Sequence, residues 1–169
     1  MSGPHHPSSF GTVGSLRKLH FGASVLAFTL VAGCSYHEGE AALEAGDAQR
    51  AAERWQSASD LGDPKAKLAL ARLYLSGEGV PRDAAAAEQL VKPMAETAVE
   101  WRRLWAQEVL ADIYQQQGKT EEAVRWYKEA TDLGNPSAKN KLAAAYLEGN
   151  GVKKDVEQAV VLYKEGAEA

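Results

Sequence analysis

The chain has 169 residues, of which 45% are hydrophobic and 25% are charged, and its formal net charge is -4. These proportions are typical of a folded domain and exclude an intrinsically disordered chain. The acidic excess disfavours nucleic acid as a partner, because proteins that bind nucleic acid need a basic face.

The distribution of histidine and cysteine excludes most catalytic sites. All four histidines and the single cysteine lie within the first 37 residues. If a leader ending at Gly33 is removed, only Cys34 and His37 remain of these residues. The rest of the chain then lacks the parts of a His/Cys zinc site, a Ser–His–Asp triad or a Cys–His pair. The sequence therefore predicts no enzyme, no metal site and no cofactor.

The segment before residue 34 has the pattern of a signal peptide. Arg17 and Lys18 are followed by an apolar run over residues 19–30 and by small residues directly before Cys34. The apolar run is shorter than the roughly 20 residues that a transmembrane helix needs. The alternatives are an ordinary signal peptide with an incidental cysteine and a retained transmembrane anchor.

The sequence Val-Ala-Gly-Cys that ends at Cys34 resembles the lipobox of bacterial lipoproteins. The resemblance implies a lipid on Cys34, and several acyl chains on one residue give stable membrane anchoring. Ser35 implies an outer-membrane location facing the periplasm, or the cell membrane if the host is Gram-positive. The expected organisation is a signal peptide over 1–33, a lipidated tether over 34–39 and a repeat domain over 40–169.

A long internal repeat follows the leader. Shifting the chain by 72 residues aligns many identical residues, from Gly46 with Gly118 to Ala87 with Ala159. A shift of 72 is two periods of 36 residues, and a looser copy lies between them. There Leu110–Tyr114 matches the earlier Leu70–Tyr74 at a spacing of 40. Tyr114 to Tyr146 then spans only 32, because about four residues lie before this helix instead of in the turn after it.

Each repeat is predicted to be a pair of helices. Residues 49–61 and 64–75 carry apolar residues at helical spacing, and no segment shows the alternation of a strand. Gly62 suits the left-handed position that ends a helix. Asp63 is expected to cap the next helix with Pro64 in its first turn, and Asn135-Pro136 repeats this pair. The predicted fold class is all-α.

The pattern resembles the Sel-one-like repeats, which are relatives of the tetratricopeptide repeat. It is carried by the following residues: Ala123, Trp126, Tyr127, Ala130, Leu133, Gly134, Ala138, Leu142, Tyr146, Gly149, Gly151, Val152 and Asp155. The resemblance implies a right-handed α/α solenoid of about three helix-turn-helix repeats. It also implies that the concave side binds peptides or partner proteins.

Seven side chains are candidates for contact with a partner. The charged residues on the first helices of the repeats, which are expected to line the groove, are Arg50, Arg54, Glu122 and Arg125. The aromatic candidates are Trp101, Trp105 and Trp126. The alternative for the charged residues is a solvated surface, and for the tryptophans it is core filling.

The last predicted helix, over residues 155–169, has no second helix after it. Because each repeat buries a face on its neighbour, this helix is either a cap or an open face. An open face would dock a partner or an identical chain, or belong to a longer array. Val160, Val161 and Tyr163 make the helix less polar than a cap is expected to be.

The leading functional hypothesis is a periplasm-facing lipoprotein scaffold. Residues 42–47 (ALEAGD) after the lipobox resemble the start of alginate-export scaffold lipoproteins, which implies a role in exopolysaccharide export. A second scaffold role is pilus or outer-membrane protein assembly. The alternative of another class is a repeat enzyme that binds or hydrolyses β-lactams, but the cysteine pairs and the Ser-x-x-Lys motif of such an enzyme are missing.

Overall fold

The computed structural model describes residues 36–97 and 99–167, and within these ranges the chain is helical and without strands. Residues 36–44 are helical, and seven further helices follow. They are α2 (Ala48–Asp60), α3 (Pro64–Ser76), α4 (Ala84–Thr97), α5 (Glu100–Gln116), α6 (Thr120–Asp132), α7 (Pro136–Glu148) and α8 (Val156–Ala167). The prediction of an all-α fold is confirmed.

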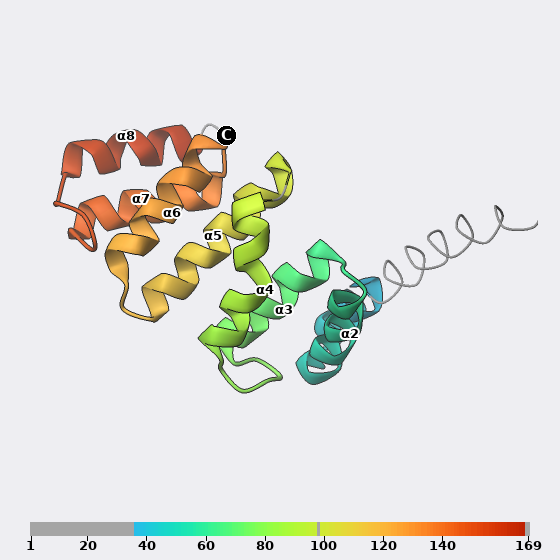
Figure 1. Ribbon diagram of the computed structural model, residues 1–169. Coiled ribbons are helices and arrows are strands. Elements are labelled where there is room, and N and C mark those ends of the chain that lie inside the picture. The colour runs from blue at the N-terminus through green and yellow to red at the C-terminus, as the bar shows by residue number, and fades with distance from the viewer. Residues whose placement is uncertain (1–35, 98, 168–169) are drawn as a thin grey trace, which may run out of the picture.

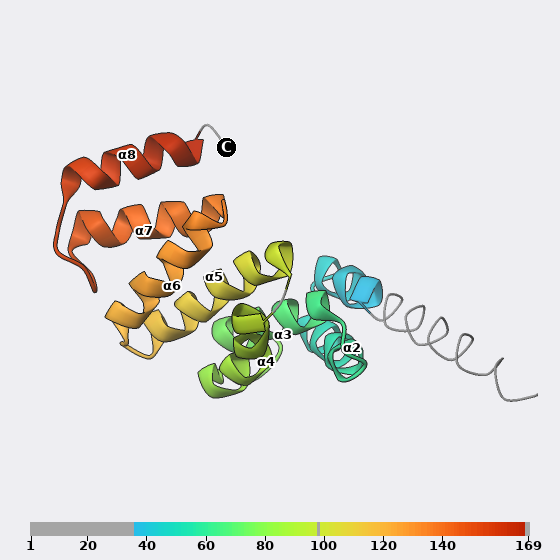
Figure 2. The ribbon, with the colours of Figure 1, turned by 45° about the horizontal axis from the view of Figure 1, so that its top comes forward.

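The helices stack in chain order into an elongated array (Figure 1). The main contacts join consecutive helices, and α3 also contacts α5 directly. Figure 2 shows α8 at one end of the array and α2 near the other. Packing between near neighbours along the chain is the mark of a solenoid, so the predicted α/α solenoid is confirmed as well.

The predicted helix ends are confirmed at both copies of the strong repeat. Gly62 follows α2 at φ +88°, a conformation that favours glycine. The Asp63 side chain accepts hydrogen bonds from the backbone N–H groups at the start of α3, and the Asn135 side chain does the same for α7. In both helices proline occupies the first turn, where its missing N–H costs nothing.

Two glycines fix the packing of the turns after α3 and α7. Gly79 lies against the backbone of Ala48 at the start of α2, and Gly151 lies against the backbone of Thr120 at the start of α6. Both glycines have positive φ, and a Cβ at either position would overlap the neighbouring backbone. The same close approach therefore recurs 72 residues apart.

The middle repeat differs in the predicted way. Helix α5 has 17 residues, whereas α3 and α7 have 13 each, and Gly118 makes the short turn that follows it. Helix α4 also contains Pro93, which the sequence pattern did not single out. Proline removes one backbone hydrogen bond from the helix interior, and this contributes to the irregularity of the unit.

The core is continuous between neighbouring helices, with one cluster of buried residues from α3 to α8 and a second over residues 42–73. Trp55 on α2 and Tyr127 on α6 lie 72 residues apart, at equivalent positions of the repeats, and are 4% and 2% exposed. Tyr36 stacks on Trp55 with ring centroids 6.3 Å apart, and Trp55 Nε1 donates a hydrogen bond to the Tyr36 carbonyl oxygen. The helical body is thus present at residue 36, although the sequence placed its start at residue 40.

Candidate functional site

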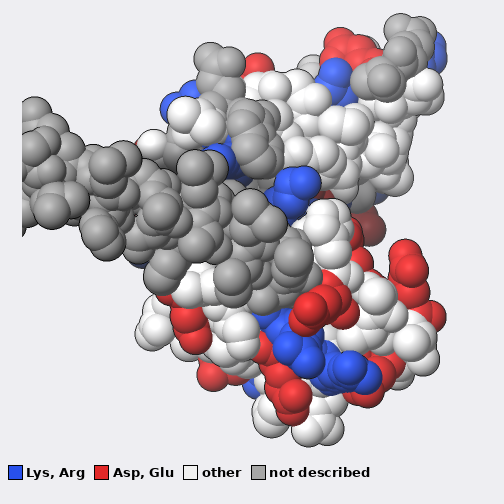
Figure 3. All heavy atoms as spheres, turned by 90° about the vertical axis from the view of Figure 1, so that its right-hand side faces the viewer, with Lys and Arg blue, Asp and Glu red and all other residues white. Residues whose placement is uncertain are grey.

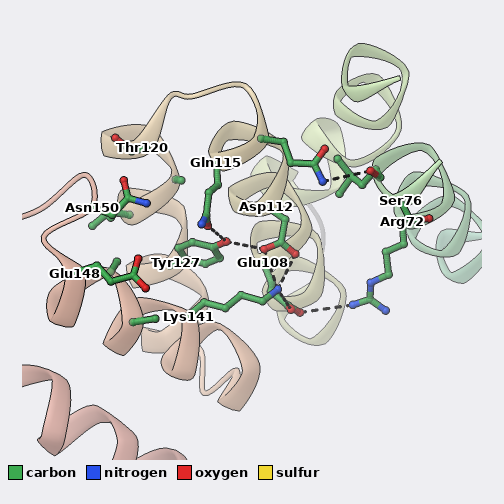
Figure 4. A pocket seen from close by; sticks show the side chains of 16 residues that line it. Arg72, Ser76, Glu108, Asp112, Gln115, Thr120, Tyr127, Lys141, Glu148 and Asn150 are labelled. Carbon is green, nitrogen blue, oxygen red and sulfur yellow. Dashed lines mark hydrogen bonds and ion pairs between the residues drawn. The ribbon is translucent and has the colours of Figure 1, made fainter. Parts of the chain in front are cut away.

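A hollow with a volume of about 680 Å³ lies along the second helices of successive repeats. Its walls are α3, α5, α6 and α7, and Asn150 closes one end (Figure 4). We call this hollow the main groove. Because four helices from successive repeats form it, its shape depends on the stacking of the array.

A second hollow of about 510 Å³ adjoins the main groove along α3. It is lined by residues 36–44, by Trp55 on α2 and by α3. Arg72 and Ser76 line both hollows. We call the second hollow the N-terminal groove, and the two grooves meet at Arg72.

A buried carboxylate forms the centre of the main groove. The Glu108 side chain is only 5% exposed, and its Oε1 lies 2.7 Å from Lys141 Nζ. The Ser137 hydroxyl donates to the same oxygen at 2.7 Å, and Arg72 Nη2 lies 3.6 Å from Oε2. Lys141 also bonds Asp112 at 2.6 Å, so one ammonium joins two carboxylates of α5 (Figure 4).

The pairing keeps these groups charged. Burial alone would raise the pKa of Glu108, but hydrogen bonds from Lys141 and Ser137 outweigh burial and lower it. Burial alone would lower the pKa of Lys141, but hydrogen bonds to Asp112 and Glu108 outweigh burial and raise it. Glu108 and Lys141 are therefore both ionised near neutral pH.

Tyr127 adds a neutral donor to this network. Its hydroxyl lies 2.6 Å from Asp112 Oδ1 and 2.8 Å from Gln115 Oε1, and donates its single proton to one of them at a time. Burial, and then the charge of Asp112, raise its pKa far above the ordinary value. The hydroxyl therefore stays protonated and ties α6 to α5 in the wall of the groove.

The arginines predicted on the first helix lie outside both grooves. Arg50 and Arg54 line a shallow hollow of about 420 Å³ between residues 38–47 and α2, and Arg54 Nη1 pairs with Glu38 at 3.2 Å. On the end of the array nearest α2, the visible acidic and basic side chains lie side by side (Figure 3). These arginines remain predictions for partner contact.

The described candidates on α5 and α6 also lie away from the grooves. Arg125 and Trp126 line a hollow of about 610 Å³ formed with α4 and α5, and Arg125 pairs with Glu122 at 3.9 Å. Trp105 is 37% exposed, and the side chain of Trp101 lies outside the described part. The structure thus brings Arg125 and Trp126 together and leaves their role untested.

Sequence reasoning missed the residues of the main groove, although a signal for them was present. Arg72 in Leu70–Tyr74 and Asp112 in Leu110–Tyr114 occupy the same position of aligned repeats. A charged residue that occurs at the same place in two second helices, between apolar residues that face the core, indicates that both helices line one polar surface. Glu108 lies one helical turn before Asp112, so both face the same side.

Two kinds of feature are absent from the described residues. No helix among them is both long and apolar enough to cross a bilayer. The same residues contain no group of three or more His, Cys, Asp or Glu side chains placed to hold a metal ion. Cys34 and the predicted leader lie outside the described residues.

Comparison with known proteins supports the repeat assignment. The sequence model of the Sel1 repeat matches four segments, over residues 30–63, 64–96, 106–135 and 136–169. Each of the last three segments pairs a second helix with the first helix that follows it, so the family counts four units where the sequence predicted about three. Chitin synthase regulatory factor 4 from Schizosaccharomyces pombe is 34% identical over 90 residues. That match covers 53% of this chain and 14% of the relative.

Two solved structures have a similar fold. A Sel1 repeat protein from Oxalobacter formigenes has a TM-score of 0.65 at 22% identity, over 84% of this chain and 60% of that one. The protective antigen c5321 of uropathogenic Escherichia coli, which displays an SLR fold, has a TM-score of 0.65 at 26% identity, over 86% and 32%. The chain spans less than two thirds of each of these proteins, as it does of the curated relative.

Proposed function

Because the chain belongs to the Sel1 repeat family, we propose that it is a scaffold whose main groove binds a segment of another protein. The observation that carries the proposal is the groove itself. Four helices build it, and a buried charge network between Glu108 and Lys141 holds two of its walls together. Sel1 repeats are generally protein-binding scaffolds without catalysis, and a pre-formed groove suits that role.

Site-specific photocrosslinking in the native host tests this proposal. A photoreactive amino acid at Thr120, which lines the groove, is compared with the same amino acid at exposed Lys153, which lines no described hollow. We expect one discrete protein adduct at Thr120 and none at Lys153. Equal adducts at both positions, or none at either, would contradict binding in the groove.

We also propose that the scaffold is anchored to the outer membrane by a lipid on Cys34. The proposal rests on the lipobox resemblance and on the signal-peptide pattern from Arg17 to Gly33. Labelled palmitate fed to a Gram-negative host is expected to enter the wild-type chain and not the Cys34→Ser variant. An unlabelled wild-type chain would refute the anchor and leave the groove proposal intact.

Exopolysaccharide export is the pathway that we propose for this scaffold, on the resemblance of residues 42–47 to alginate-export lipoproteins. Pilus or outer-membrane protein assembly is the alternative. The identity of the protein crosslinked at Thr120 separates the two, because it would be an export-pore component in one case and an assembly component in the other. The enzyme alternative predicts turnover of a chromogenic β-lactam by the purified chain, and we expect none.

Self-association is a second candidate function, favoured by the outer face of α8. Val124 and Tyr127 on α6 are 4% and 2% exposed, whereas Val160 and Tyr163, one period later on α8, are 46% and 40% exposed. Helices α5 and α7 both pack on α6, but the main packing of α8 among the described helices is with α7. A second copy that covers this face would bury an apolar patch of the kind found at interfaces.

Sedimentation velocity of the full chain tests self-association. We expect the wild type to sediment faster as its concentration rises over about a hundredfold range, and Val160→Lys to remain monomeric. The matched control is Lys153→Glu, which changes an exposed charge beside α8. A wild-type monomer throughout, or oligomers that persist in Val160→Lys, would exclude assembly through α8.

A further inference from the structure

The side chains that line the two grooves carry an excess of negative charge. Arg72 and Lys141 are their only lining cations among the described residues, whereas six carboxylates line them. Those carboxylates are Glu40, Glu44, Glu78, Glu108, Asp112 and Glu148. Both cations are already paired with Glu108, and Lys141 is also paired with Asp112.

Three of the carboxylates have no partner among the described residues. The side-chain carboxylates of Glu44, Glu78 and Glu148 make no hydrogen bond or ion pair there, and all three residues are exposed. Glu44 and Glu78 line the N-terminal groove, and Glu148 lies in the main groove near Asn150 (Figure 4). Unpaired anions in a hollow raise the local concentration of cationic ligands, because surrounding low-dielectric walls focus the field.

Apolar side chains also line both grooves. Leu43, Ala69 and Leu73 line the N-terminal groove, and Val124 and Ala144 line the main groove. This surface offers contact to apolar side chains, while the carboxylates offer contact to basic ones. A nucleic acid or an acidic polysaccharide has the wrong charge for such a site.

The linings of the two grooves are continuous, which suits an extended segment. The grooves share Arg72 and Ser76, and their linings together extend from residues 36–44 to α7. An extended chain turns alternate side chains to opposite sides, so one set contacts the apolar lining residues and the other set contacts the carboxylates. Asn150 has a side-chain amide without a described partner, and an amide both donates to and accepts from a peptide backbone.

We propose that the joined grooves bind an extended, basic segment of the partner protein, in which lysine or arginine alternates with apolar residues. This proposal rests on the proposed function and specifies its ligand. Charge complementarity at such a site contributes mainly to specificity and to the rate of association. The carboxylates Glu44, Glu78 and Glu148 then carry the selectivity.

The direct test is the binding of a labelled peptide to the full chain in detergent solution. The probe has about twelve residues and alternates lysine with valine, and a matched probe alternates glutamate with valine. At about 0.15 M salt we expect the wild type to bind the lysine probe at least about tenfold more tightly than the glutamate probe. Equal affinity for both probes, or no binding of the lysine probe, would overturn the proposal.

Two triple variants with the same change in net charge locate the binding. Glu44→Gln/Glu78→Gln/Glu148→Gln alters the grooves, whereas Glu53→Gln/Glu121→Gln/Glu157→Gln alters exposed carboxylates that line no described hollow. We expect the first to weaken binding of the lysine probe about tenfold and the second less than about twofold. Equal losses would show attraction to the whole acidic surface and refute a groove site.

Different results would refute the proposal of groove binding and the proposal of a basic ligand. A partner crosslinked at Thr120 together with a lysine probe that does not bind would retain the groove and refute the basic ligand. Absence of the Thr120 adduct would refute the proposed function itself, whatever the peptide result.

Discussion

Lys141 Nζ lies 2.7 Å from Oε1 of Glu108, and this bond joins α7 to α5 across the main groove. The carboxylate is almost fully buried, whereas the lysine is 35% exposed. A buried charge that loses its partner is costly, although replacing both members of such a pair with apolar residues is often neutral. The pair therefore matters more for the order of the groove wall than for net stability.

Lys141→Met is expected to lower the free energy of unfolding by about 2 kcal/mol, less than for a fully buried pair because Lys141 is partly solvated. Urea denaturation measures the loss. The double variant Lys141→Met/Glu108→Leu should recover most of it, because no unpaired charge remains. Lys153→Met is the matched control, and an equal loss there would show that the pair has no special role.

Glu108 gives a prediction for acid stability. Its pKa is lowered in the folded chain, so its contribution is fully present above the unfolded value near 4.5 and is lost as pH falls through the folded pKa. The urea midpoint should therefore fall with acidification below that value. The fall should be shallower in Glu108→Gln, whose uncharged amide has no such titration. If the urea midpoint of Glu108→Gln falls with pH as steeply as that of the wild type, the lowered pKa of Glu108 does not account for the acid sensitivity.

Asn135 and Asp63 occupy the same cap position 72 residues apart, but their surroundings differ. Asn135 is fully buried, and its Nδ2 also donates to the Leu104 carbonyl oxygen at 3.1 Å. We expect Asp63→Ala to cost about 1 kcal/mol for the lost cap. Asn135→Ala should cost about 2–4 kcal/mol, since buried hydrogen bonds are lost as well. Thermal unfolding compares the two, and equal losses would refute the difference.

Alanine substitutions at Gly134 and Gly151 separate the cost of a strained backbone conformation from the cost of a steric overlap. Both have positive φ, but only Gly151 has another backbone where a Cβ would lie. Gly134→Ala should cost about 1 kcal/mol for the strained conformation. Gly151→Ala should cost roughly 3 kcal/mol or more, because α6 must also move. Denaturant midpoints of the two variants test this, and a smaller effect at Gly151 would contradict the contact with Thr120.

The local features of the fold were predictable from the sequence because local residues determine them. The caps at Asp63 and Asn135 and the left-handed conformation of Gly62 each depend on a short stretch of chain. Pro93 was not expected inside a helix, because proline disfavours a helix interior, but α4 continues through it.

The groove was not predictable in the same way. Its walls come from α3, α5 and α7, and the bond between Glu108 and Lys141 spans 33 residues of sequence. Which side of a helix faces the groove depends on how successive repeats rotate in the stack, and a sequence pattern does not specify that rotation. The charged candidates were therefore sought on the first helices, at Arg50 and Arg125, whereas the main groove is lined largely by second helices.

The most direct test of the central claim is the affinity of the partner that crosslinks at Thr120 for two tryptophan variants of the full chain. Ala144→Trp fills the main groove, whereas Ala85→Trp adds the same side chain at an exposed position of α4 that lines no described hollow. The account predicts that Ala144→Trp weakens binding at least about tenfold and Ala85→Trp less than about twofold. Undiminished binding by a folded Ala144→Trp variant would contradict a scaffold that binds its partner in this groove.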